Sequence, residues 1–136
     1  MIRPFSNILI INSNKAELTR VEEFLKEVFI NYELPTENFN KVLLCVSEAI
    51  VNSIVHGHKN RVDKEISIQV VSEEREISIT VTDEGEGFDI NQVPDPTSHA
   101  NIKKESGRGI HIIKSISNSL KFNDKGNSLQ FQIKCK

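Results

Sequence analysis

One stretch of this chain, residues 45–57, constrains the fold more than any other. Apolar residues recur in and just before it at helical spacing, on the face that a core would bury: Val42, Leu43, Val46, Ala49, Ile50 and Ile54. On the other side Glu48, Asn52 and His56 follow one another at intervals of four, so they share one stripe of the same helix. Gly57 is the expected C-terminal cap. Polar side chains beside a buried face need partners or a ligand, so the pattern predicts a helix that carries a binding site.

The residues before this helix predict one strand and one further helix. Phe5–Asn12 is apolar and rich in β-branched residues, as strands are. Asn14, with Glu17 three residues later, approximates a capping box that opens a helix. The apolar face of that helix consists of Leu18, Val21, Leu25, Val28 and Phe29. Pro35 ends it, and Thr36 is the expected N-cap of the helix that follows.

The second half of the chain predicts two β-hairpins. Apolar and polar residues alternate in two runs, and the apolar set is Ile66, Ile68, Val70, Ile77, Ile79 and Val81. The polar residues 72–75 between the runs are the expected turn. Two short runs close the chain, Ser119–Phe122 and Ser128–Lys134, with residues 124–127 as the turn between them.

A third helix is expected between the hairpins. Residues 91–106 show no periodicity and contain two prolines, as in the lid of a binding site. Residues 107–109 then open a helix whose inward positions are Ile110, Ile113 and Ile116. The resulting order, β-α-α-β-β-α-β-β, predicts a single α+β domain over residues 1–136. We expect a two-layer sandwich in which helices cover one face of a mixed, mainly antiparallel sheet.

Composition excludes several classes of protein. Hydrophobic residues make up 38% of the chain and charged residues 26%, which is typical of a folded globular domain. A net charge of −2, without a basic run, argues against a direct nucleic-acid binder. No apolar stretch reaches membrane-spanning length, and the N-terminus lacks signal-peptide features. Cys45 and Cys135 are far apart, which argues against a disulfide framework or a cysteine metal site and favours a cytoplasmic setting.

The commonest phosphate-binding motifs are missing. The chain has no G-x-x-x-x-G-K-[ST] sequence, and Ile90 stands where a dinucleotide fingerprint needs its third glycine. What remains is E-x-x-x-N-x-x-x-H-G from Glu48 on, D-x-G-x-G from Asp83 on, and S-G-x-G from Ser106 on. In this order the motifs resemble the GHKL ATP-binding fold of sensor histidine kinases, type II topoisomerases and a class of chaperones. The short length and the first motif look most like the bacterial anti-sigma-factor serine/threonine kinases, and the resemblance covers essentially the whole chain.

The resemblance implies roles for three polar residues. Asn52 would offer its side-chain oxygen to Mg²⁺, a hard cation that takes a few protein oxygens besides phosphates. Glu48 would accept the proton of an attacking serine hydroxyl as general base. Asp83 would accept a hydrogen bond from the amino group of adenine. Purely structural roles stay open for all three residues. Asn52 could hold two helices together, Glu48 could make a structural hydrogen bond, and Asp83 could belong to an Asx turn.

The glycines of the second and third motifs complete the implied ATP site. Gly85 and Gly87 would let the backbone pass close to the base, although ordinary turn chemistry explains them as well. Gly107, Arg108 and Gly109 would present backbone N–H groups to the phosphates at the start of a helix. Arg108 would contact a phosphate or face solvent.

By resemblance, then, the chain is an ATP- and Mg²⁺-dependent serine/threonine protein kinase and an anti-sigma regulatory factor. It would sequester a sigma factor, phosphorylate an anti-anti-sigma antagonist, and form a homodimer. Ser53 and His58 depart from the residues that these kinases mostly carry there. Two alternatives remain: a nucleotide-dependent binding module of the same fold without kinase activity, and a detached histidine-kinase catalytic domain.

Overall fold

The computed structural model describes residues 5–57, 64–73, 76–84, 105–123 and 127–135. In chain order the strands and helices are β1 Phe5–Asn12, α1 Leu18–Asn31, α2 Phe39–Asn52, β2 Glu65–Glu73, β3 Glu76–Asp83, α4 Glu105–Ile116, β4 Ser119–Phe122 and β5 Ser128–Lys134. Two 3₁₀ turns, η1 Lys15–Glu17 and η2 Thr36–Asn38, precede α1 and α2, and a π-helical turn, η3 Ser53–Gly57, follows α2. The predicted order of strands and helices is confirmed.

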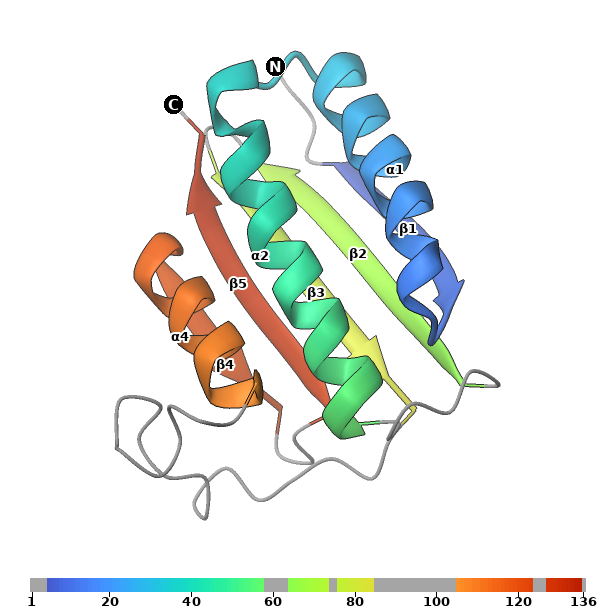
Figure 1. Cartoon of the computed structure of the whole chain (residues 1–136). Helices are drawn as coiled ribbons and strands as arrows, with labels where there is room; N and C mark the ends of the chain where they lie inside the picture. The colour runs from blue at the N-terminus through green and yellow to red at the C-terminus, as the bar shows by residue number, and fades with distance from the viewer. Residues whose placement is uncertain (1–4, 58–63, 74–75, 85–104, 124–126, 136) are drawn as a thin grey trace.

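The five strands form one sheet in the order β1-β2-β3-β5-β4, and α1, α2 and α4 lie over one of its faces (Figure 1). This confirms the two-layer α+β sandwich. Every pairing among the described strands is antiparallel, so the parallel share implied by a mixed sheet is not found there. The two helices between β1 and β2 carry the chain away from one end of the sheet and back, so Asn12 pairs with Glu65.

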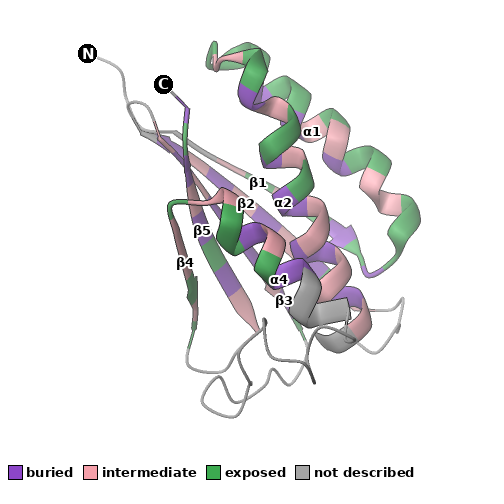
Figure 2. Cartoon of the chain, turned by 60° about the vertical axis from the view of Figure 1, so that its left-hand side comes forward, coloured by how far each residue is buried: buried purple, intermediate pink, exposed green. Residues whose placement is uncertain are grey.

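The hydrophobic core lies between the sheet and the helices. Along β3 the predicted alternation is confirmed, because every second side chain is buried. The inward set on β2, β3 and β5 is Ile66, Ile68, Val70, Ile77, Ile79, Val81, Leu129, Phe131 and Ile133. Figure 2 shows the same alternation of buried and more exposed positions along the strands. Asp83 continues the inward series, so this carboxylate ends β3 on the helix-covered side.

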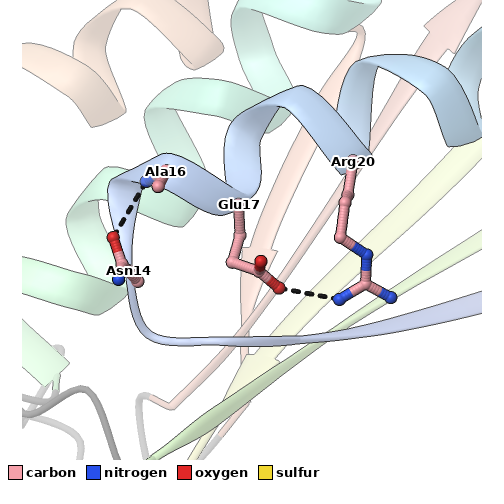
Figure 3. Close-up of polar contacts among 4 residues, drawn as sticks. All are labelled: Asn14, Ala16, Glu17 and Arg20. Carbon is pink, nitrogen blue, oxygen red and sulfur yellow. Dashed lines mark hydrogen bonds and ion pairs between the residues drawn. The ribbon is translucent and has the colours of Figure 1, made fainter.

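The entry into α1 agrees with the sequence in part. The Asn14 side chain accepts a hydrogen bond from the backbone N–H of Ala16 at 2.9 Å, as a capping residue does. Glu17 does not close a capping box: its carboxylate binds Arg20 Nη1 at 2.7 Å (Figure 3). The α1 face is buried as predicted, at Val21, Leu25, Val28 and Phe29, with Leu18 partly buried.

Both predicted caps of α2 are wrong. Thr36 lies inside the turn η2, whose N-cap position is Pro35, and neither Pro35 nor Asn38, the N-cap of α2, makes a side-chain capping hydrogen bond within the described residues. At the other end Ser53 is the C-cap, since its N–H reaches the carbonyls of Ala49 and Ile50. Gly57 instead ends the π-helical turn η3. Both differences arise because helical turns of other pitch extend α2 beyond its α-helical hydrogen bonds.

Other boundaries shift by one or two residues. Ser72 belongs to β2 and pairs with Ile77, so the strand extends into the predicted turn. The helix α4 begins at Glu105, ahead of the predicted start at Gly107. The rest of the predicted lid, residues 91–104, and most of the last turn, residues 124–126, lie outside the described residues. No helix in the described parts of the chain is long and apolar enough to cross a membrane.

Candidate nucleotide site

The helix α2 carries the first two candidate residues on its flank. Its apolar face is buried against the core at Val42, Cys45, Val46, Ala49 and Ile50. Glu48 and Asn52 are half-buried and stand one turn apart. Burial raises the pKa of the Cys45 thiol to about 11, and the negative charge of Glu48 adds to this shift. The carboxylate of Glu48 therefore lies near the buried Cys45 thiol.

The Glu48 carboxylate lies against α4. A Cβ added to the buried Gly109 would stand 3.0 Å from Glu48 Oε2, and 3.8 Å from both Glu48 Cβ and Glu48 O. A glycine at this position thus lets α4 approach α2 closely, with the carboxylate in the space that a side chain would fill. Although they are far apart in sequence, Glu48 and the S-G-x-G motif meet.

The first turn of α4 holds Gly107 and Arg108. An α-helix leaves the N–H groups of its first turn without acceptors inside the helix, so these positions suit the predicted contact with phosphates. Gly109 is the fifth residue of α4, where the N–H normally bonds within the helix. What the structure shows for Gly109 is close packing on Glu48, and its predicted N–H contact stays a prediction. The Arg108 side chain lies outside the described part of the chain.

The side-chain oxygen of Asn52 is the next candidate ligand atom. This Oδ1 is buried and finds no hydrogen-bond partner among the described residues. A buried amide oxygen without a partner is costly, which points to a ligand at this position. The π-helical turn η3 starts at the next residue, and such turns occur often at functional sites. Within the described residues no cluster of three acidic, histidine or cysteine side chains could hold a metal by itself.

Asp83 is the last residue of β3, and η3 contacts this strand. Asp83 is 8% exposed, and it pairs with Ile66 of the neighbouring strand β2. Both main-chain polar groups of Asp83 bind Asn127, a residue that no sequence motif indicated. The Asp83 N–H donates to the Asn127 carbonyl at 2.9 Å, and the Asp83 carbonyl accepts from Asn127 Nδ2 at 2.8 Å. Two polar residues at the end of a hairpin, Asn123 and Asn127, were the available signal.

The candidate residues that the structure describes therefore gather at one end of the sandwich. The end of α2, the start of α4 and the end of β3 all lie at the lower edge in Figure 1. Gly85 and Gly87 follow Asp83 and lie outside the described residues, as does the side chain of His56. The arrangement offers a buried carboxylate, an unpartnered amide oxygen, a second carboxylate and a helix start, which together suit a nucleotide with a divalent cation.

Comparison with known proteins agrees with this geometry. Residues 11–133 match the histidine kinase-like ATPase domain. The anti-sigma F factor of Clostridium beijerinckii is 35% identical over 104 residues, which cover 74% of this chain and 72% of that protein. The anti-sigma F factor of Clostridium botulinum (strain Eklund 17B / Type B) is 33% identical over 119 residues, covering 79% and 82%.

A solved structure shares the fold. It contains the RsbU and RsbW domains of Rv1364c from Mycobacterium tuberculosis, and it superimposes on 99% of this chain with a TM-score of 0.63. The chain spans about a third of that protein, 32%, and the sequences are 10% identical. This likeness bears on the arrangement of helices and strands alone.

Proposed function

The chain belongs to the histidine kinase-like ATPase domain family, and from this premise we propose that it is an ATP- and Mg²⁺-dependent serine/threonine protein kinase and an anti-sigma regulatory factor. The GHKL resemblance seen in the motifs is confirmed at the level of the family. The observation that carries the proposal is the position of Glu48, whose carboxylate lies against α4 at Gly109, directly after the first turn of this helix. A candidate base thus stands beside the helix start proposed to hold the phosphates.

Nucleotide binding is proposed to use both ends of this site. The carboxylate of Asp83 would accept a hydrogen bond from the amino group of adenine, and guanine presents a carbonyl at the equivalent position. The first turn of α4 would donate backbone N–H groups to phosphate oxygens. Asn52 Oδ1 fits a Mg²⁺ ligand, because it is a buried oxygen without a described partner. Bound there, Mg²⁺ would neutralise phosphate charge and orient the terminal phosphate.

Phosphotransfer is proposed to proceed with Glu48 as base. The serine oxygen of the protein substrate forms a bond to the terminal phosphorus while the bond to the leaving ADP oxygen breaks. Glu48 takes the proton that the serine hydroxyl loses, and the products are phosphoserine and ADP. Because phosphoryl transfer has a loose transition state, positioning by the helix start and by Asp83 contributes alongside the base.

The protein partners are proposed from the relatives. Both Clostridium proteins are named anti-sigma F factors, so we infer that this chain sequesters a sigma factor. The phosphate acceptor would be a serine of an anti-anti-sigma antagonist, and the active species would be a homodimer. A binding module without kinase activity would share the ATP site and the sigma factor, so only a transfer assay separates the two functions.

Calorimetric titration with ATP, with and without Mg²⁺, tests the site first. Wild type should bind ATP with Mg²⁺-linked affinity, and Asp83→Asn should lose at least tenfold, about 1.4 kcal/mol. The matched control is Glu84→Gln, which removes the same charge at the next, exposed position and should bind like wild type. If wild type does not bind ATP, or if both variants lose affinity equally, the assignment of the site fails.

A transfer assay then separates the functions. Incubation with labelled ATP and a candidate antagonist should give acid-stable phosphoserine. Saturable ATP binding without transfer to any antagonist would leave the binding module as the function. An acid-labile product on a histidine of another chain would instead identify a detached histidine-kinase catalytic domain.

A further inference from the structure

Asn127, the residue before β5, binds the end of β3. The last ladder pair of β3 and β5 is Thr82 with Ser128, whose hydroxyl groups also lie 2.9 Å apart. One residue beyond, the Asp83 N–H donates to the Asn127 carbonyl at 2.9 Å, and Asn127 Nδ2 donates to the Asp83 carbonyl at 2.8 Å. One side chain and its own backbone thus bind both main-chain polar groups of Asp83.

Asn127 is itself held in a single orientation. Asn123 Nδ2 donates to Asn127 Oδ1 at 2.8 Å, and Asn123 Oδ1 accepts from the N–H groups of Asn127 and Ser128 at 3.0 and 3.1 Å. A backbone carbonyl can only accept, so the amide atom of Asn127 that faces Asp83 must be the nitrogen. The amide oxygen is then left for Asn123. The contacts with Asp83 and with Asn123 therefore both require that the nitrogen of the Asn127 amide faces Asp83.

We propose that Asn127 is a positioning residue for the base of the nucleotide, acting through Asp83 without touching the ligand. The proposal rests on the proposed function, which puts the amino group of adenine at the Asp83 carboxylate. A hydrogen bond weakens steeply when its angle or length departs from the optimum. With both backbone groups of Asp83 held, its Cα and the direction of its buried side chain are set before the nucleotide arrives, which lowers the ordering cost of binding.

A purely structural role for Asn127 predicts a different result, and the chain offers a matched control for it. Asn118 also joins two strands by one side-chain hydrogen bond, since its Oδ1 accepts from the Lys134 N–H at 2.9 Å. It precedes β4, at the end opposite to the turn that holds Asn127. Asn118→Ala should therefore reproduce the loss of hairpin stability without moving Asp83.

The test measures ATP and GTP affinity by calorimetry for wild type, Asn127→Ala, Asn127→Asp and Asn118→Ala, beside the melting temperature of each. Asn127→Asp keeps the size and the acceptor facing Asn123 but removes the donor to Asp83, so it serves if Asn127→Ala does not fold. We expect both Asn127 variants to raise the dissociation constant for ATP about 5- to 30-fold. They should also narrow the preference for ATP over GTP, while Asn118→Ala changes neither.

Each outcome decides between the two proposals. If Asn127 variants bind ATP as tightly and as selectively as Asn118→Ala, the positioning role is overturned while the ATP site stands. If wild type itself binds no ATP, the proposed function fails first. A loss of ATP affinity with unchanged selectivity would also contradict the positioning of the base, because only the contact to adenine distinguishes the two nucleotides.

Discussion

The helices α1 and α2 form a natural comparison, because each has 14 residues, each covers the same face of the sheet, and each ends in asparagine. In α1 the polar residues meet solvent. Glu22 pairs with Lys26 at 3.5 Å on the surface, and the final Asn31 is exposed. Such a helix uses its apolar side for the core and its polar side for solubility.

In α2 the corresponding polar residues are half-buried. Glu48 lies under α4 at Gly109, and the final Asn52 has an Oδ1 that is buried without a described partner. Two helices with similar apolar faces thus differ in what covers their polar flank. An amphipathic pattern alone therefore places a helix on the core, while the burial of its polar residues distinguishes α2 as the helix proposed to bind the nucleotide.

We expect the largest effect from the substitution that removes the proposed base of α2. Glu48→Ala should lower phosphotransfer to serine ~10²-fold or more, since general bases contribute on that scale, and leave the ATP dissociation constant within a few-fold. The matched variant on α1 is Glu22→Ala, which removes an exposed carboxylate and should transfer phosphate at the wild-type rate. Equal transfer rates in the two variants would show that Glu48 is not the catalytic base and that the polar residues of α1 and α2 do not differ in function.

The second prediction concerns pH. The pKa of the fully buried Cys45 thiol is raised from 9.0 to about 11, so the neutral thiol is the stable form in the native state. Above pH 9 the unfolded chain loses this proton first, and stability should fall as pH rises toward 11, by about 2–3 kcal/mol in total.

Urea unfolding at pH 8 and pH 10.5 measures this loss. Cys45→Ala should unfold with a smaller difference between the two pH values than wild type, whereas Val28→Ala, a core truncation on α1, should keep the full difference. If Cys45→Ala has the same pH dependence as wild type, the thiol does not titrate as stated.

The third prediction compares the two terminal asparagines. Asn52→Leu replaces a buried oxygen without a described partner by an apolar group of similar size, so the nucleotide-free protein should gain ~1 kcal/mol of unfolding free energy. Mg²⁺-linked ATP binding should be lost in the same variant. On α1, Asn31→Leu should change stability by less than ~0.5 kcal/mol and leave binding intact. Denaturant unfolding and calorimetry read both effects, and a destabilised Asn52→Leu would favour the structural role for Asn52.

The smallest effect belongs to the start of α1. Arg20→Ala removes the 2.7 Å ion pair with Glu17, whose side chains are partly to largely exposed, and should cost at most ~0.5 kcal/mol. Differential scanning calorimetry at low and at high salt gives the difference, which should shrink in high salt. A larger, salt-independent cost would show that polar contacts on α1 matter as much as those on α2.

The local spacing of apolar residues in the sequence predicted most of the fold. The alternation at Ile77, Ile79 and Val81 predicted the inward face of β3, and the helical spacing from Val21 to Phe29 predicted the buried face of α1. Both patterns report burial directly, because one face of each element meets the core. The candidate site was predicted in the same way only where the residues share one element, as Glu48 and Asn52 do.

What the sequence did not predict depends on contacts between distant segments or on helix pitch. The approach of Gly109 to Glu48, and the grip of Asn127 on Asp83, join residues that no local pattern relates. Thr36 has a suitable side chain for an N-cap, yet it is already the first residue of the turn η2, so Pro35 takes the N-cap position. The π-helical turn after Asn52 likewise has no sequence signature of its own.

The pair of hydrogen bonds between Asn127 and Asp83 also has a consequence for the rates of folding and unfolding. It lies where two hairpins join, β2 with β3 and β4 with β5, and the joining strands pair residues 46 positions apart at Thr82 and Ser128. Local hairpins close quickly, whereas pairing across a long loop costs more chain entropy and comes later. We therefore expect the Asp83 end of the candidate site to assemble late in folding. ATP should then act on the unfolding limb of a chevron plot, slowing escape from the native state while folding proceeds at its own rate.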